Sequence, residues 1–218
     1  MIRVNIFVEG QTEETFVRDV LAPVFAHREI FFNPILAETS PGHKGGIVSY
    51  GKTKRQIERL CLHDQGAYVT TMIDFYGLPT DFPGLSDPAI ANEPDIQLRI
   101  RRLEDALEQS VNQPKFIANY LLHEFEALLF CQPEKFADWL DDDAPVAVLE
   151  QIKAQFVSPE LINNSPQTAP SKRILAAIPA YKKTLHGPLI AGDIGLDIIR
   201  QQCAHFNQWL ERIEALEQ

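Results

Sequence analysis

Residues 2–16 read IRVNIFVEGQTEETF, and this stretch decides the class of the fold. Ile2–Val8 alternates apolar side chains and is rich in β-branched residues, which is typical of a β-strand. Glu9 and Gly10 follow at once, and a helix is predicted to begin near Thr12, which can cap it, with acidic residues in its first turn. A buried strand that ends in a carboxylate and passes directly into a helix predicts the first β–α unit of an α/β fold.

Strand and helix patterns alternate along the first part of the chain. Pro23 is predicted to kink or divide the first helix. Further strands are predicted at residues 30–37, 67–73 and 115–122, and helices at 56–63 and 95–111. Beyond Pro133 the pattern predicts only short helices, at residues 147–156, 171–177, 195–203 and 205–216. We therefore expect a parallel α/β domain over residues 1–132 and a helical C-terminal extension over residues 133–218 packed on it.

Composition limits the kind of protein. The 218 residues carry a net charge of −10, which argues against a chain that coats nucleic acid by charge alone but leaves a metal-dependent enzyme open. No run approaches the roughly 20 apolar residues of a membrane span, and the first residues lack a signal-peptide pattern. Cys61, Cys131 and Cys203 are widely spaced in apolar surroundings, so we expect reduced thiols in a cytoplasmic protein.

Acidic side chains follow three of the predicted strands. Glu9 follows the first, Asp74 the third, and Glu124 and Glu126 the fourth. Because the carboxyl ends of parallel strands meet at one edge of a sheet, these acids are expected to lie close together. Carboxylate oxygens are the ligands that Mg²⁺ prefers, and without a cation the acids would repel one another. The alternative is that each acid is a separate loop residue in water.

Two short segments are predicted to contact phosphate. Gly10, with Thr12, allows a phosphate to approach the start of the first helix, although a plain strand-to-helix turn also favours glycine. Lys172 and Arg173 lie at the start of a predicted helix and are the basic pair best placed for the same purpose. Other basic residues, such as those of segment 99–102, are typical of a solvated face.

Residues 4–17, VNIFVEGQTEETFV, resemble the first motif of the Toprim domain of topoisomerases, primases and overcoming-lysogenization-defect nucleases. Glu9 matches the glutamate of that motif. Residues 69–77, VTTMIDFYG, resemble the second motif, Asp-x-Asp, in part: Asp74 matches the first aspartate, and Tyr76 stands where the second would be. More closely, the chain resembles a bacterial family of unknown function, domain of unknown function 4276, which is considered Toprim-like. The resembling stretches are VEGQTEE, MIDFYGLP, HEFEALLF, PSKRI and IGLDIIRQQCAHFNQWL.

This resemblance implies a Toprim-like, Rossmann-like fold and a metal-dependent site. The second aspartate of the Toprim motif is replaced by Tyr76, and Asp81, Glu124 or Glu126 could supply the missing carboxylate ligand. If residues 123–126 are helical, His123 and Glu126 share a face, so Glu126 is preferred as the ligand and His123 or Glu124 as its support. The alternative is a helix start that is merely enriched in acid.

Residues 46–53, GIVSYGKT, also satisfy the spacing of a nucleotide-binding P-loop. We disfavour this interpretation, because no strand leads directly into the loop and its middle positions hold Ile47, Val48 and Tyr50. A flexible loop that leads into a basic helix start at Lys52, Lys54 and Arg55 is the preferred interpretation.

The first functional hypothesis is an enzyme of phosphoryl transfer, most simply a nuclease, that uses Mg²⁺ or Mn²⁺ held by Glu9, Asp74 and Glu126. Nucleic acid would be its substrate. The alternative is a non-catalytic binding or regulatory subunit with a degenerate site, which Tyr76 favours. Resembling families often accompany an ATPase in bacterial defence against phage, so the resemblance implies an ATPase partner. A nucleotide-binding protein that uses residues 46–53 is a third, weaker hypothesis.

Overall fold

A parallel β-sheet organises the chain in the computed structural model, which describes residues 1–40, 42–140, 144–163 and 166–216. The sheet consists of β1 (Ile2–Val8), β2 (Ile30–Leu36), β5 (Tyr68–Asp74), β6 (Phe116–Ile117) and β7 (Tyr120–Leu121). The order is β2-β1-β5-β6, with β7 also paired to β5, and each pairing is parallel. The predicted α/β class, a parallel sheet flanked by helices with a helical C-terminal part, is confirmed.

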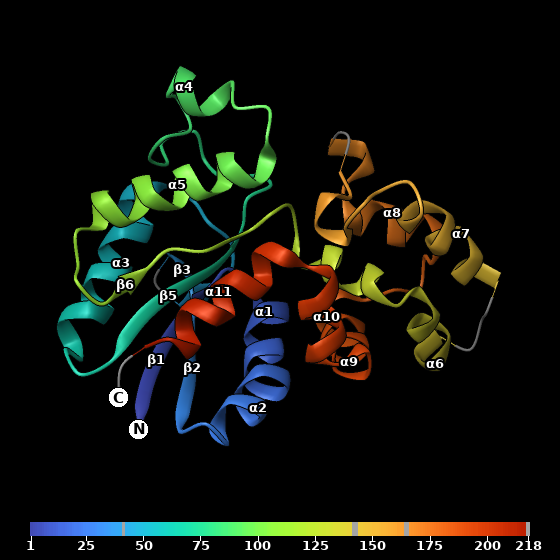
Figure 1. Cartoon of the computed structure of the whole chain (residues 1–218), viewed down its shortest axis with the longest axis horizontal. Helices are drawn as coiled ribbons and strands as arrows, with labels where there is room; N and C mark the ends of the chain where they lie inside the picture. Colours follow the sequence, from blue (N-terminus) through green and yellow to red (C-terminus); the bar gives the residue numbers. More distant parts are fainter. Residues whose placement is uncertain (41, 141–143, 164–165, 217–218) are drawn as a thin grey trace.

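Helices cover both faces of this sheet, so the central strand β1 is buried on both sides. Val4, Ile6 and Val8 belong to the core on one face, together with α1 and the C-terminal helices. Phe7 belongs to the core on the other face, together with α3 and α5. Figure 1 shows α3 and α5 on one side of the strands and α1 and α2 on the other. These helices are α1 (Gln11–Phe16), α2 (Ala22–Ala26), α3 (Tyr50–His63) and α5 (Ile96–Val111).

The first helix widens before Pro23 instead of breaking there. Between α1 and α2 lies a π-helical segment, η1 (Val17–Leu21), in which the Ala22 N–H donates to Val17 O, five residues back. Proline has no N–H, and its ring clashes with the carbonyl four residues earlier in a regular α-helix. The wider π-turn accommodates the ring, so the predicted division takes the form of a local widening.

The fourth predicted strand is interrupted after two residues. The Ala118 N–H donates to Glu108 Oε1 at 2.8 Å, and the Asn119 N–H donates to Thr71 Oγ1 at 2.9 Å. These amides therefore bond to side chains rather than to the backbone carbonyls of β5. The prediction of one continuous strand over residues 115–122 is wrong for this reason, and β6 and β7 take its place.

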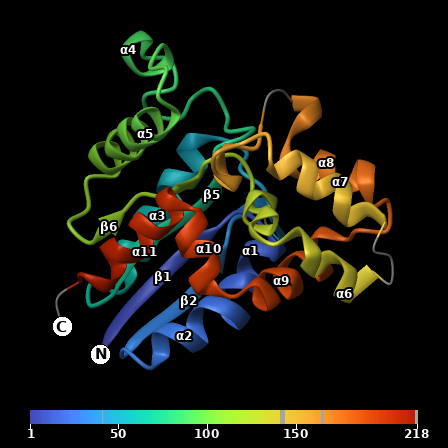
Figure 2. The same cartoon turned by 45° about the vertical axis from the view of Figure 1, so that its right-hand side comes forward.

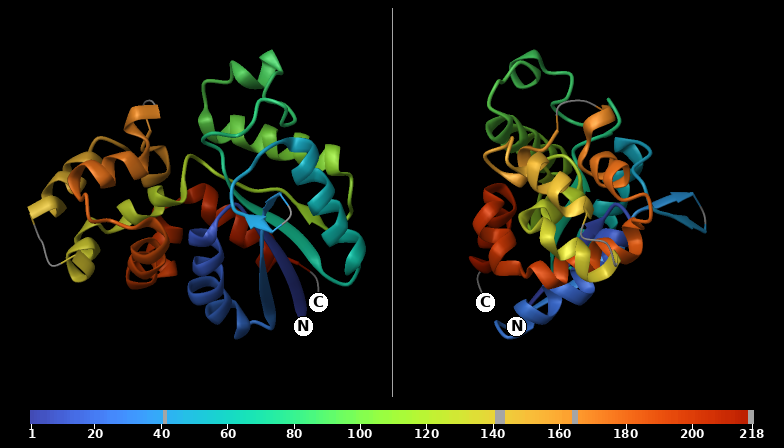
Figure 3. Two further views of the ribbon diagram at one scale, coloured as in Figure 1. Left: turned by 180° about the vertical axis from the view of Figure 1, so that it is seen from behind. Right: turned by 90° about the vertical axis from the view of Figure 1, so that its right-hand side faces the viewer.

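A small hairpin, β3 (Glu38–Ser40) and β4 (His43–Lys44), lies between β2 and α3 and projects from the body of the molecule (Figure 3). The P-loop interpretation of residues 46–53 does not match this arrangement. Residues 50–53 are already part of α3, and Thr53 Oγ1 donates to Ser49 O within the helix at 3.1 Å.

The C-terminal helices fold back onto the sheet. Trp209 in α11 donates from Nε1 to Thr70 Oγ1 in β5 at 2.9 Å, and Phe206 and Trp209 share one core with β1. Figure 2 shows α11 and α10 lying across the strands, with α6 to α8 further out. The remaining helices are α4 (Pro88–Ala91), η2 (Phe125–Cys131), η3 (Pro133–Phe136), α6 (Ala137–Leu140), α7 (Ala144–Lys153), η4 (Pro159–Leu161), η5 (Pro166–Thr168), α8 (Pro170–Ala177), α9 (Lys183–Ile194), α10 (Leu196–Gln202) and α11 (Ala204–Glu214).

The part of the chain that the structure describes contains no strand after β7, as predicted. The boundary between residues 132 and 133 stays a prediction. Cys61, Cys131 and Cys203 are buried free thiols. Within the described ranges, no helix combines the length and the apolar character needed to cross a membrane.

Candidate metal centre

The strand order creates a reversal point between β1 and β5. The chain leaves β1 toward α1 on one face of the sheet, and it leaves β5 toward α5 on the other face. In open parallel sheets, ligands bind beyond the carboxyl ends of the strands at such a point. Glu9 follows β1 and Asp74 ends β5, so both acids lie there.

Glu9 and Asp74 are in contact. The Asp74 N–H donates to Glu9 Oε2 at 3.3 Å, and Asp74 Oδ1 accepts a hydrogen bond from the Phe125 N–H at 3.1 Å. These bonds tie together the ends of β1 and β5 and the start of η2. The structure thus brings Glu9 and Asp74 into contact, and their binding of a metal ion stays a prediction.

The segment that follows β7 differs from the expected helix. The chain remains extended at Glu124, and the 3-10 helix η2 begins only at Phe125. Glu124 Oε2 accepts a hydrogen bond from the Ser171 N–H at 2.9 Å, and His123 Nδ1 lies 3.3 Å from Asn163 Nδ2. Glu124 and Glu126 are both buried, and the charges of both carboxylates contribute to raising the pKa of Asp74. Glu126 as the preferred ligand, with His123 or Glu124 as its support, stays a prediction.

Glu13 is a further acid of the site. Its Oε2 accepts a hydrogen bond from the Gly10 N–H at 2.8 Å, and Gly10 rather than Thr12 is the N-cap residue of α1. The predicted Thr12 cap is wrong, because the helix already begins at Gln11 and Thr12 lies inside its first turn. A Cβ atom at position 10 would lie 2.9 Å from Glu13 Oε2, so a larger residue there would displace the Glu13 carboxylate.

Lys183, at the start of α9, supplies a positive charge. Its Nζ lies 3.2 Å from Glu126 Oε1, and its side chain is 43% exposed whereas that of Glu126 is 2% exposed. Burial acts to lower the pKa of Lys183, but the charges of Glu126 and Glu124 outweigh burial and raise it. Lys183 is therefore held in its charged form beside the acids.

These side chains surround one open cavity of about 470 Å³. The cavity is lined by Glu9, Gly10, Gln11, Thr12, Glu13, Gly45, Gly46, Asp74, Glu126, Lys183 and Thr184. We call Glu9, Glu13, Asp74, Glu124 and Glu126 the acid cluster, with Glu124 lying outside this lining. The predicted residues Gly10 and Thr12 line the cavity together with four of the acids, Glu9, Glu13, Asp74 and Glu126.

The acid cluster disfavours its own ionisation. Burial raises the pKa of Glu13 to about 7, and the charges of Glu126 and Glu9 add to this effect. Burial also raises the pKa of Asp74 well above its usual range, with further contributions from Glu13 and Glu9. The pKa values of Glu9 and Glu126 are raised by burial as well, although Lys183 opposes the shift in both. A positive charge placed in the cavity would relieve this repulsion.

The donor set suits a hard divalent cation. Carboxylate oxygens from Glu9, Asp74 and Glu126 are the ligands that Mg²⁺ or Mn²⁺ accepts, and Mg²⁺ takes one or two of them together with water and phosphate. Among the described residues, no three His, Cys, Asp or Glu side chains are already arranged as ligands of one ion. The chemistry of the carboxylate oxygens fits the cation, and Glu9, Asp74 and Glu126 are the residues that would hold it.

The other predicted residues lie outside the cavity. Arg173 donates from Nε to Thr168 O at 2.6 Å and stacks on the Phe156 ring, and Lys172 is exposed one position earlier. Asp81 accepts a hydrogen bond from the Tyr50 N–H at the start of α3, so it does not join the acid cluster. Substrate binding by Lys172 and Arg173 stays a prediction.

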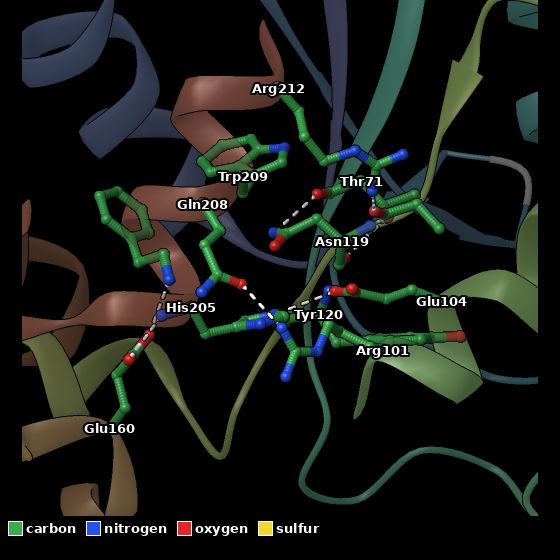
Figure 4. A network of polar contacts seen from close by, with 12 residues as sticks. Thr71, Arg101, Glu104, Asn119, Tyr120, Glu160, His205, Gln208, Trp209 and Arg212 are labelled. Carbon is green, nitrogen blue, oxygen red and sulfur yellow. Dashed lines mark hydrogen bonds and ion pairs between the residues drawn. The ribbon is translucent and has the colours of Figure 1, made fainter. Parts of the chain in front are cut away.

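A second buried polar network lies between α5, α11 and the β6–β7 segment (Figure 4). Glu160 accepts hydrogen bonds from the His205 N–H at 3.0 Å and the Phe206 N–H at 2.8 Å. Glu104 Oε1 accepts from the Tyr120 N–H at 2.9 Å and lies 3.0 Å from His205 Nε2. Burial acts to lower the pKa of His205, but Glu104 outweighs it and raises that pKa. We call these residues the paired network.

Comparison with known proteins identifies a family. One family model, described as a domain of unknown function (DUF4276), matches residues 8–214. The C-terminal region of the OLD protein of Xanthomonas campestris pv. campestris is similar in structure over 99% of each chain, at 15% sequence identity and a TM-score of 0.42. A second structure of that region covers 98% of each chain at 14% identity and a TM-score of 0.40. No curated protein matches the chain.

Proposed function

This chain belongs to the family of domain of unknown function 4276, and for it we propose a Mg²⁺- or Mn²⁺-dependent phosphoryl-transfer activity, that of a nuclease. The observation that carries the proposal is the acid cluster, which gathers carboxylates from three strand ends at the reversal point of a parallel sheet. Structural buried acids are normally matched by donors. Here the acids outnumber the cationic side chains of the described cavity lining, in which Lys183 stands alone.

Each residue of the site has a role in this proposal. Glu9 and Asp74 would hold the cation from the sheet edge and Glu126 from η2. When bound, the cation would neutralise charge on a scissile phosphate and lower the pKa of an attacking water. Alternatively, Glu9 would accept a proton from that water instead of binding the cation, and Lys183 would meet the negative charge of the phosphate.

The test is cleavage of labelled DNA and RNA, single- and double-stranded, by the purified chain with Mg²⁺, Mn²⁺ or EDTA. We expect metal-dependent cleavage that falls at least about 100-fold in Glu9→Gln and Asp74→Asn. Glu134→Gln, an exposed carboxylate on η3, is the matched control and should cleave like the wild type. Equal cleavage by Glu9→Gln and the wild type would overturn the proposal.

A specific observation favours one rival function, a regulatory subunit of an ATPase that works in defence against phage. Tyr76 occupies the second aspartate position of the Toprim motif, and its N–H is fixed to His123 O at 3.0 Å. Calorimetry with Mg²⁺ and Mn²⁺ separates the two functions. Metal binding that is lost in Asp74→Asn supports the enzyme, whereas a wild-type chain that binds no metal but binds the ATPase tightly supports the regulatory subunit.

A further inference from the structure

Helix α3 presents three cations on one exposed face. Lys52, Arg55 and Arg59 follow one another at spacings of three and four residues, which places them on the same side of a helix. All three are exposed. Lys54 points elsewhere, because its Nζ donates to Ser110 O at 2.7 Å and lies 3.7 Å from Glu58. We call Lys52, Arg55 and Arg59 the α3 basic stripe.

The α3 basic stripe borders a cleft against the hairpin. The cleft has a volume of about 350 Å³, and Glu38, Thr39 and Ser40 of β3 form its other wall. Gln56 fixes β3 in place, since its side chain accepts from the Glu38 N–H at 2.8 Å and donates to Glu38 O at 3.1 Å. Figure 3 shows the hairpin and α3 on the same side of the sheet in the view from behind.

The stripe is not neutralised by ion pairs. Within the described residues, the ion pairs of lysine and arginine involve other positions, and the nearest side-chain contact of Lys52 is a hydrogen bond to Thr39 O at 3.0 Å. Glu38 is the acid among the described residues that line the cleft. A local excess of positive charge therefore persists on a chain whose net charge is −10.

The hairpin connects the stripe to the acid cluster. The Gly46 N–H donates to Glu9 O at 2.8 Å, and the Gly45 N–H donates to Ala37 O at 2.8 Å, so the base of the hairpin lines the acidic cavity. Strand β3 begins at Glu38, the residue after Ala37, and runs along α3. Helix α3 itself starts at the carboxyl edge of the sheet, so the stripe extends away from the cavity.

We propose that the α3 basic stripe binds the phosphate backbone of a nucleic acid whose scissile phosphate lies in the cavity of the acid cluster. This inference rests on the proposed function. A polyanion is repelled by the acid cluster and by the net charge, so binding requires a local cationic surface beside the site. Arginine forks suit phosphate oxygens, and the spacing from Lys52 to Arg59 covers roughly 10 Å of helix.

The test measures binding of fluorescein-labelled DNA and RNA oligonucleotides by anisotropy, with EDTA present to prevent cleavage. In the triple variant Lys52→Gln, Arg55→Gln and Arg59→Gln, affinity should fall at least about tenfold at 100 mM salt. The slope of log affinity against log salt should become shallower by up to about 2.7 on a duplex and about 2 on a single strand, since each lost contact removes about 0.9 or 0.7.

The control is a second triple variant with the same charge change, Arg18→Gln, Arg28→Gln and Arg101→Gln, at exposed positions away from α3. It should retain the wild-type slope. Both triple variants should keep the wild-type melting temperature and Mg²⁺ affinity. Wild-type affinity and slope in the stripe variant would overturn this inference even if metal-dependent cleavage is present. Failure of the wild type to bind or cleave any nucleic acid would overturn the proposed function as well.

Discussion

The acid cluster and the paired network both bury carboxylates beside the same sheet, but they balance them differently. In the paired network, Glu160 and Glu104 meet three backbone amides and the ring of His205. In the acid cluster, four of the carboxylates accept one backbone amide each as well, those of Glu9, Glu13, Asp74 and Glu124. The five carboxylates nevertheless lie close enough to repel one another, and among the described residues Lys183 forms an ion pair with Glu126 alone. The carboxylates of the paired network are matched by their donors, whereas those of the acid cluster hold more negative charge than one lysine offsets and raise one another's pKa values.

Because of this difference, substitutions in the two regions should change the stability of the protein in opposite directions. Removing a carboxylate from the paired network should leave amide donors without partners, which costs stability. Neutralising a carboxylate of the acid cluster should relieve repulsion, which adds stability at the expense of cation binding. Substitutions of the same chemical kind therefore have opposite expected signs in the two regions.

The largest expected effect is that of Glu160→Gln. Both carboxylate oxygens of Glu160 accept amide hydrogens, and an amide side chain offers one oxygen and turns an NH₂ group toward the other donor. We expect a loss of about 3 kcal/mol in the free energy of unfolding, measured by urea denaturation. The exposed Glu134→Gln should change it by less than about 0.5 kcal/mol. If the Glu160→Gln protein were as stable as the wild type, the proposed difference between the paired network and the acid cluster would be contradicted.

The second prediction concerns pH. The folded-state pKa of Glu13, about 7, lies above the ordinary value of 4.5, so its stabilising contribution is complete below pH 4.5 and disappears as pH rises through 7. The free energy of unfolding of the metal-free protein should fall by roughly 2 kcal/mol between pH 5 and pH 8. Glu13→Gln should flatten this profile, as should saturating Mg²⁺. Rising stability of the metal-free wild type over that range would contradict the electrostatic description of the cluster.

A smaller effect is expected at Tyr181. Its hydroxyl is buried and has no hydrogen-bond partner among the described residues, and a Cβ atom at Gly187 would lie 3.1 Å from it. Tyr181→Phe should stabilise the metal-free protein by about 1 kcal/mol, because an unpaired polar group is removed. Tyr50→Phe is the matched control and should destabilise, since the Tyr50 hydroxyl lies 2.5 Å from Ser110 Oγ. Destabilisation by both changes would indicate that the Tyr181 hydroxyl has a partner of its own.

Local patterns predicted most of the fold. Ile2–Val8 was recognisable because alternation and β-branching persist over the whole strand, and the amphipathic spacing of α5 is equally clear. The fourth strand could not be delimited, because its interruption depends on Glu108 and Thr71, which lie elsewhere in the chain. Helix α9 was missed because its sequence contains Pro188 and has little amphipathic pattern.

The candidate site was predictable only in part. Glu9 and Asp74 were found because an acid at a strand end is visible locally and the topology of a parallel sheet brings such ends together. Lys183 carries no local signal, since its partner Glu126 lies 57 positions away in sequence. Glu13 resembled a first-turn acid, and only its hydrogen bond to Gly10 shows that it turns toward the cavity.

The most direct test of the central claim is a crystal soaked in Mn²⁺ and measured at a wavelength where manganese scatters anomalously. We predict an anomalous peak within coordinating distance of Glu9 and Asp74, about 2.0–2.3 Å from at least one carboxylate oxygen of each. The peak should be absent in Asp74→Asn. Strong anomalous signal elsewhere and none at the acid cluster would contradict the claim that these carboxylates hold a divalent cation.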